Sequence, residues 1–128
     1  MNPMNWDAWV FSAKLAWHRP ILRWTALMTL AIAVVGAAVF YYKVIPPRRH
    51  AGTAIIHYNI YLGIDDVRAW PWIFLFPSVW LLVSLVDLLV AFGYYHHDPF
   101  LSSSLIYLAF LSALPCAGAL LYLARMNV

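Results

Sequence analysis

The chain has 128 residues, of which 65% are hydrophobic and only 10% are charged, and its formal net charge is +3. This composition excludes a water-soluble domain, because so small a globule has too little interior to hide long apolar runs. The basic residues lie beside those runs, so their expected contacts are lipid headgroups and not nucleic acid. We predict an all-α membrane protein, a single membrane domain over residues 1–128. In it, three transmembrane helices follow an interfacial amphipathic helix, and a short strand-like loop joins the first two spans.

Residues 5–18 form the first predicted element, an amphipathic helix at the membrane surface. Asn5 can cap it, and Pro20 ends it by holding Arg19 in an extended conformation. The apolar face holds Trp6, Trp9, Val10, Ala13, Ala16 and Trp17, and the polar face holds Asp7, Lys14 and His18. Two interpretations stay open, a tail that lies in the headgroups and a docking helix for a partner subunit. Three tryptophans within a dozen residues are the reason to keep the second.

The first transmembrane span is predicted over residues 21–42, a run long enough to cross a hydrocarbon core of about 30 Å. We expect it to be retained as a span and not removed as a signal peptide. Small residues recur every four positions along one face, which lets another helix approach closely. They are Thr25, Thr29, Ala33 and Ala37. Whether the approaching helix belongs to this chain or to a partner is open at this point.

The predicted loop, residues 43–69, contains a strand-like segment. From residue 54 to residue 62, apolar and polar side chains alternate, which is typical of a strand. Gly63 permits a turn, and we expect His57, Asn59 and Asp65 to converge on one small polar site. The simpler interpretation is a hydrogen-bonded cluster that folds the loop onto the membrane surface. A metal site is disfavoured, since one histidine and one carboxylate are too few ligands.

This loop resembles one in a known family. The residues Ile56-His57-Tyr58-Asn59, then Gly63-Ile64-Asp65, ahead of Pro77, are similar to the His-aromatic-Asn and Gly-x-Asp loop of the bacterial sporulation-delay-toxin immunity proteins and of small three-helix bacterial membrane proteins. The resemblance implies an outward-facing loop, whereas a count of Lys and Arg favours a cytoplasmic one. Ile56 replaces the family's usual proline, and the additional helices of the full immunity proteins are missing, so the loop architecture is implied more strongly than toxin immunity.

The second span is predicted over residues 71–95. Aromatic residues typical of membrane interfaces stand at its two ends, namely Trp70, Trp72, Tyr94 and Tyr95. Pro77 lies about one turn inside and is expected to bend the helix near its start.

The third span is predicted over residues 99–124 and follows a connection so short that the two helices must be antiparallel neighbours. Asp98 can cap it and Pro99 can start it. Pro115 falls in mid-span and is expected to kink it, with Ser112 placed to help satisfy the carbonyl group that the proline leaves free.

Asp87 is the acidic residue deep in a predicted span. At matching depth on the neighbouring helices we expect Thr29 and Tyr107. The favoured interpretation is a hydrogen-bonded strut between helices. A contact with a partner subunit and a proton relay stay open, although one acidic group alone makes a poor relay.

No cofactor and no metal are expected from the motifs, because the sequence has no metal-ligand pattern. His96 and His97 adjoin in a short turn, where neighbouring side chains point apart, and a pigment or haem contact there stays open.

The sequence lacks a nucleophile-base pair and a phosphate-binding glycine loop, so we do not expect an enzyme. The leading hypothesis is a non-catalytic accessory or assembly subunit of a larger complex in a bacterial cytoplasmic (inner) membrane, with the bilayer and other membrane subunits as partners. The partner-facing residues are predicted to be Trp6, Trp9, Trp17, Thr25, Ala33 and Ala37. One alternative is an immunity or sensor-type protein that recognises a ligand or peptide through the His57-Asn59-Asp65 loop. Another is a proton-coupled carrier that uses Asp87.

Overall fold

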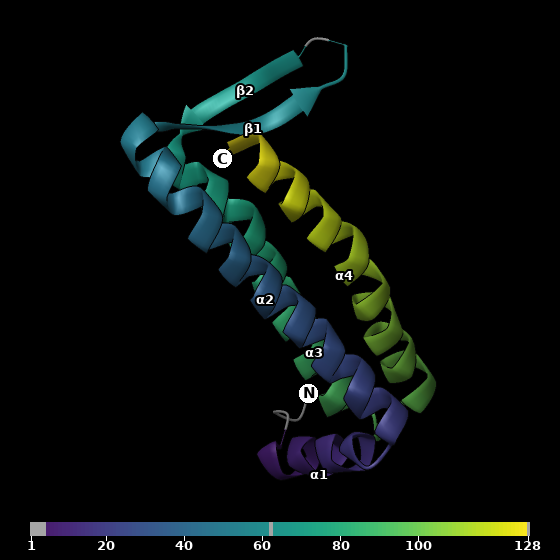
Figure 1. The fold of residues 1–128 in the computed structure, drawn as a ribbon. Helices are drawn as coiled ribbons and strands as arrows, with labels where there is room; N and C mark the ends of the chain where they lie inside the picture. Colours follow the sequence, from purple (N-terminus) through teal and green to yellow (C-terminus); the bar gives the residue numbers. More distant parts are fainter. Residues whose placement is uncertain (1–4, 62, 128) are drawn as a thin grey trace.

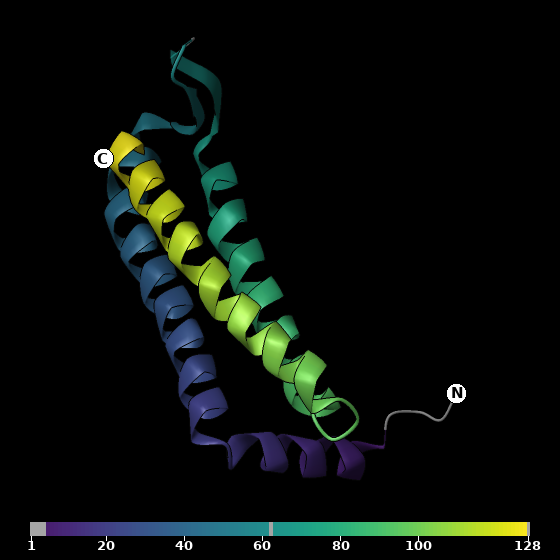
Figure 2. The same cartoon turned by 90° about the vertical axis from the view of Figure 1, so that its right-hand side faces the viewer.

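The computed structural model describes residues 5–61 and 63–127, and for residues 47–49, 57–59 and 63–66 it describes the backbone only. Three long helices lie side by side, a short helix crosses one end of them, and a hairpin of two strands stands at the other end (Figures 1 and 2). In chain order the elements are α1 (Trp6–Trp17), α2 (Pro20–Ala51), β1 (Thr53–Asn59), β2 (Gly63–Ala69), a 3-10 turn (Trp70–Phe74), α3 (Leu75–Tyr94) and α4 (Pro99–Asn127).

Three segments are long and apolar enough to cross a membrane: Pro20–Pro46, Trp70–Tyr94 and Pro99–Asn127. Only 28%, 28% and 22% of the residues in their most apolar stretches are buried within the protein. The remaining apolar side chains point outward, where water would make their exposure unfavourable and lipid would not. The chain is therefore a multi-pass membrane protein.

The interior of the bundle consists of two apolar clusters. The cluster nearer the hairpin centres on Phe40, Trp80 and Leu120, one side chain from each long helix. The cluster nearer α1 joins Leu22, Leu88 and Ile106, again one from each helix. Small residues between them allow the helices to approach each other closely. The small-residue row predicted on the first span takes part: Thr29, Ala33 and Ala37 are all buried within the chain.

The first span continues well past the predicted end at residue 42, because α2 passes through Pro46 and ends only at Ala51. Val44 is fully buried in the cluster near the hairpin, and the helix continues although Ile45, which precedes Pro46, would favour an extended backbone. Gly52 then takes a φ of 74°, a left-handed conformation that suits glycine and ends the helix. The predicted loop of residues 43–69 is thus the end of α2 followed by the hairpin.

The hairpin pairs β1 with β2 in antiparallel fashion, from Thr53 with Ala69 to Asn59 with Gly63 at the far end. The register is irregular on both sides of His57, which indicates a local bulge. Gly63, predicted to permit a turn, is the first residue of the second strand.

Two prolines behave differently from the prediction. Pro77 was expected inside a helix, but α3 begins at Leu75, so Pro77 lies in the first turn, where its missing N–H has no helical partner to lose. Pro115 does lie inside α4. The Ser112 hydroxyl donates to the carbonyl of Ala109, at 2.9 Å, and not to that of Leu111, the carbonyl that Pro115 leaves free.

The helix starts follow the predicted capping residues. The Asn5 side chain accepts a hydrogen bond from the Asp7 backbone at 3.3 Å, and the Asp98 carboxylate accepts one from the Leu101 backbone at 2.9 Å. Both bonds satisfy N–H groups that the first turn of a helix leaves without a partner.

Candidate functional site

Asp87 lies on α3, half-buried, immediately before the buried Leu88. The structure does not join it to the two residues predicted at its depth. Thr29 is fully buried, but its hydroxyl donates to the Thr25 carbonyl of its own helix, at 2.9 Å. Tyr107 is 42% exposed on α4. Within the described part of the chain the Asp87 carboxylate makes no hydrogen bond or ion pair, so the hydrogen bonds of the predicted strut are not formed there, and the partner contact and the relay stay predictions.

The predicted polar site of the loop lies in the far half of the hairpin. The backbone pairs Asn59 with Gly63 and His57 with Asp66, which brings the segment containing Asp65 alongside the one containing His57. The side chains of His57, Asn59, Gly63 and Asp65 lie outside the described part of the structure, so their convergence stays a prediction.

The near half of the hairpin is fastened to the bundle by Asn127, which is fully buried at the end of α4. Its side-chain oxygen accepts a hydrogen bond from the Ile55 N–H at 2.7 Å, and its side-chain nitrogen donates to the Ile55 carbonyl at 2.8 Å. The amide thus binds both backbone groups of one strand residue, as a neighbouring strand would. Where the two strands join the helices, the N–H of Trp70, which follows β2, donates to the carbonyl of Gly52, which precedes β1, at 3.1 Å.

At the other end of the bundle, Ser12 fastens α1 to α3. Its hydroxyl donates to the Phe92 carbonyl at 3.0 Å and accepts a hydrogen bond from the His96 N–H at 2.8 Å. The Phe92 carbonyl belongs to the last turn of α3, where carbonyls lack partners within the helix. Ser12 and Ala16 are the buried residues of α1, and of these two only Ala16 belongs to the predicted apolar face.

Aromatic contacts complete the attachment of α1. The Trp9 indole lies directly against the backbone of Gly93, and a Cβ atom at that position would overlap it. The Trp17 and Phe92 rings pack at an angle of 50° with centroids 6.2 Å apart. Arg23 lies over the Trp17 ring at 5.9 Å from its centroid, a cation–π contact. The orientation of α1 is therefore fixed by packing as well as by hydrogen bonds.

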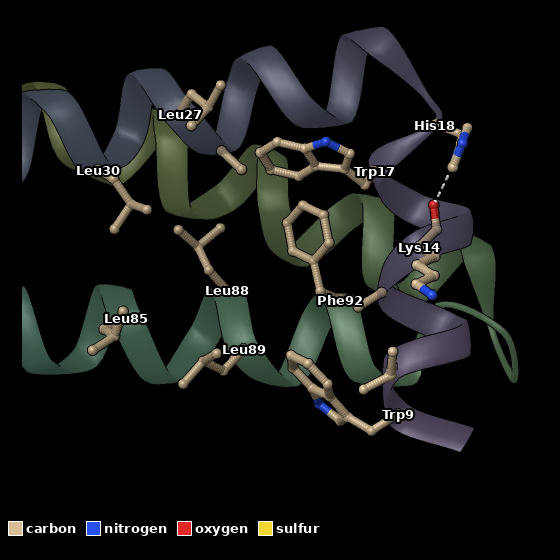
Figure 3. A pocket seen from close by; sticks show the side chains of 13 residues that line it. Trp9, Lys14, Trp17, His18, Leu27, Leu30, Leu85, Leu88, Leu89 and Phe92 are labelled. Atoms are coloured by element: carbon tan, nitrogen blue, oxygen red, sulfur yellow. Dashed lines mark hydrogen bonds between the residues drawn. The ribbon is translucent and has the colours of Figure 1, made fainter. Parts of the chain in front are cut away.

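A groove of about 390 Å³ lies between α1, α2 and α3. In Figure 3, Leu27 and Leu30 of α2 face Leu85, Leu88 and Leu89 of α3 across it, and Trp9, Lys14 and Trp17 of α1 stand at its end. Its lining is apolar except for Lys14 and His18 at the end of α1, so the groove can hold hydrocarbon or an apolar side chain.

The predicted partner-facing residues are buried, half-buried or exposed, and Trp9 is half-buried against Gly93. Ala33 and Ala37 are 0% and 2% exposed, so they pack inside this chain and are not available to a partner. Thr25 is half-buried, with its hydroxyl bonded to the Ile21 carbonyl at 2.8 Å. Trp6 and Trp17 are 71% and 45% exposed.

His96 and His97 have rings 5.7 Å apart at an angle of 61°, and the His96 ring also packs edge-on against Phe11. Among the described residues there is no cluster of three or more His, Cys, Asp or Glu side chains that could hold a metal ion. Cys116 is a half-buried thiol in α4.

Ser12, Gly93 and Asn127 position the ends of the molecule, and the sequence analysis singled out none of them. Ser12 and Ala16 are four residues apart, a small-residue pair of the same kind as the row recognised on the first span, and that spacing was the signal available. For Asn127, a polar residue at the end of an apolar run, no local pattern indicates a strand as its partner. Comparison with family models, curated proteins and solved structures finds no match for this chain.

Proposed function

We propose that this chain is a non-catalytic accessory or assembly subunit of a larger complex in the cytoplasmic (inner) membrane of a bacterium. The observation that carries the proposal is the firm attachment of α1. A helix that only floats in the headgroup layer needs no fixed contact with the bundle, yet Ser12 and Gly93 hold this one in a single orientation. Fixing a helix in advance lowers the entropy cost of binding a partner.

The fixed helix presents aromatic side chains outward. Trp6 and Phe11 are 71% and 52% exposed, and Trp6 stacks on Trp9 with ring centroids 5.4 Å apart. Large aromatic residues on a rigid support are typical of the residues that dominate binding energy in protein interfaces. A partner subunit that buries Trp6 and Phe11 would use both the rigidity and the exposed rings.

The test is site-specific photo-crosslinking in native membranes. A photoreactive amino acid at Trp6 is expected to crosslink to one defined membrane protein. The same group at Leu108 serves as the control, because Leu108 is 62% exposed on α4, a helix with which the described part of α1 makes no contact. Crosslinks to the same protein should disappear when Phe11 is also replaced by alanine. A chain that migrates as a monomer on native gels and gives no crosslink from Trp6 would rule the proposal out.

A second candidate, a protein that recognises a ligand or peptide through its hairpin, is supported by the Asn127 attachment. The amide fixes β1 at Ile55, and the hairpin extends beyond the end of the bundle (Figure 1). For this function, replacing His57 and Asn59 by alanine should abolish protection or signalling while membrane insertion stays normal. Unchanged activity would remove this candidate.

A further inference from the structure

A second groove, of about 490 Å³, lies between α2 and α4 near the hairpin. Apart from Lys43 and Arg125, its lining is apolar or glycine, with Val39 and Phe40 from α2 and Leu120 and Leu121 from α4. The volume lies within the range of small-molecule sites, about 300–1,000 Å³. Gly36 has no side chain and Ala117 has a small one, so a chain of methylene groups has room to lie between the two helices.

The two basic residues lie at the same end of this groove. Helices α2 and α4 run in the same direction, and both end beneath the hairpin (Figure 1). Lys43 and Arg125 are each the groove residue nearest the carboxyl end of their helix. From Val35 to Lys43 the groove is roughly 12 Å long at the helical rise per residue. The result is an apolar slot along the bundle with two cations at its interfacial end, and no acidic side chain lines it in the described part of the chain.

We propose that this groove binds one anionic phospholipid, with an acyl chain along the slot and the headgroup phosphate between Lys43 and Arg125. Both ends of the lipid then meet matching chemistry, since hydrocarbon replaces hydrocarbon in the slot and the phosphate meets two cations. The groove beside α1 has only Lys14 as a permanent cation at its rim, so its charge complementarity to a phosphate is weaker. The proposal is independent of the partner subunit.

The experiment is native mass spectrometry of the full chain, purified in mild detergent and mixed with equal amounts of dioleoyl phosphatidylglycerol and dioleoyl phosphatidylcholine. We expect one phosphatidylglycerol to be retained in preference. Replacing both cations, as Lys43→Gln with Arg125→Gln, should lower that preference by about thirtyfold, because each cation near a lipid surface contributes a factor of about five. The control, Arg19→Gln with Arg23→Gln, removes the same charge at the opposite end of α2 and should keep the preference.

A second variant tests the slot separately from the charges. Ala117→Phe keeps both cations but fills the groove, and it should release the lipid. If that variant does not fold, competition with dihexanoyl phosphatidylglycerol replaces it, and the short-chain lipid should compete poorly.

Four results would overturn the proposal. The first two are equal retention of the two lipids by the unaltered chain and a preference that survives the loss of both cations. The other two are full retention of the lipid after Ala117→Phe and equal competition by the short-chain lipid. Equal competition by the short-chain lipid would indicate a general attraction of anionic lipids to the basic residues. An equal loss of the preference in the Arg19→Gln with Arg23→Gln control would indicate the same. A protein adduct that excludes lipid from the groove would assign it to a partner helix instead.

Discussion

Ser12 and Asn127 each make two hydrogen bonds between elements far apart in the sequence, one residue at each end of the bundle. Both are almost completely buried, at 1% and 0% exposure. A buried hydroxyl or amide without partners would be unfavourable, so the geometry that satisfies these groups is strongly preferred over others. By contrast, Asp87 has no such partner among the described residues, and its carboxylate contributes no comparable restraint.

Replacing Ser12 by alanine is expected to loosen α1. The variant leaves the Phe92 carbonyl and the His96 N–H without their partner, at a cost of about 1–3 kcal/mol in local stability. Hydrogen exchange of the α1 amides in detergent or nanodiscs should speed up accordingly. Ser103→Ala is the matched control, because the Ser103 hydroxyl bonds only to Pro99 in its own helix. Equal exchange in Ser12→Ala and the unaltered chain would contradict this role.

Replacing Asn127 by leucine is expected to free the hairpin while the helices stay packed. The Ile55 N–H and carbonyl lose both bonds, again at about 1–3 kcal/mol. Exchange at the Ile55 amide and proteolysis at the hairpin should both increase. Asn127→Asp keeps the oxygen that accepts from Ile55 but not the nitrogen that donates, so its effect should be intermediate. A hairpin as protected in the leucine variant as before would show that other contacts hold it.

At the scale of elements, α1 is positioned by a close approach to α3 that only glycine allows. A methyl group at Gly93 would overlap the Trp9 indole, whereas a methyl group at Gly118 on α4 would meet nothing within 4 Å. The two glycines therefore have different roles although both lie in helices within apolar surroundings.

Gly93→Ala is expected to displace α1 and to lower stability by about 1–3 kcal/mol, as overpacking does. Gly118→Ala, the control, should raise stability by about 0.5–1 kcal/mol, since alanine favours helix. Reversible unfolding in mixed micelles measures both. Adding Trp9→Ala to Gly93→Ala should relieve the overlap and recover part of the loss. If Gly93→Ala is as harmless as Gly118→Ala, Trp9 does not pack as described.

For the whole molecule, three spans place the two ends of the bundle on opposite sides of the bilayer. Helix α1 and the turn after α3 share one end, and the hairpin and the end of α4 share the other (Figure 2). The outward apolar side chains between them are covered by lipid, which is why so small a chain needs only a narrow core.

This arrangement predicts the pattern of labelling by a membrane-impermeant maleimide. In a Cys116→Ser background, Ile60→Cys in the hairpin and His97→Cys after α3 should react from opposite sides of sealed vesicles. Ile60 is 82% exposed and His97 is also exposed, so both thiols would be accessible. Labelling of both from the same side would contradict a three-span topology.

The three spans, their approximate limits and the capping residues Asn5 and Asp98 could be predicted from the sequence, because hydrophobic length and helix-end chemistry are local properties. The end of α2 could not, since the helix continues through Pro46 while Val44 packs in the bundle. The sequence also could not show whether the small-residue row packs against a helix of this chain or of a partner. The structure buries Ala33 and Ala37 within the chain. The roles of Ser12, Gly93 and Asn127 depend on partners about 72 to 84 residues away in the chain. Composition alone determined that this chain belongs in a membrane. Only the tertiary structure decided which polar groups hold α1 and the hairpin to the bundle, because a hydrogen bond between distant residues produces no repeating pattern in the sequence of either segment.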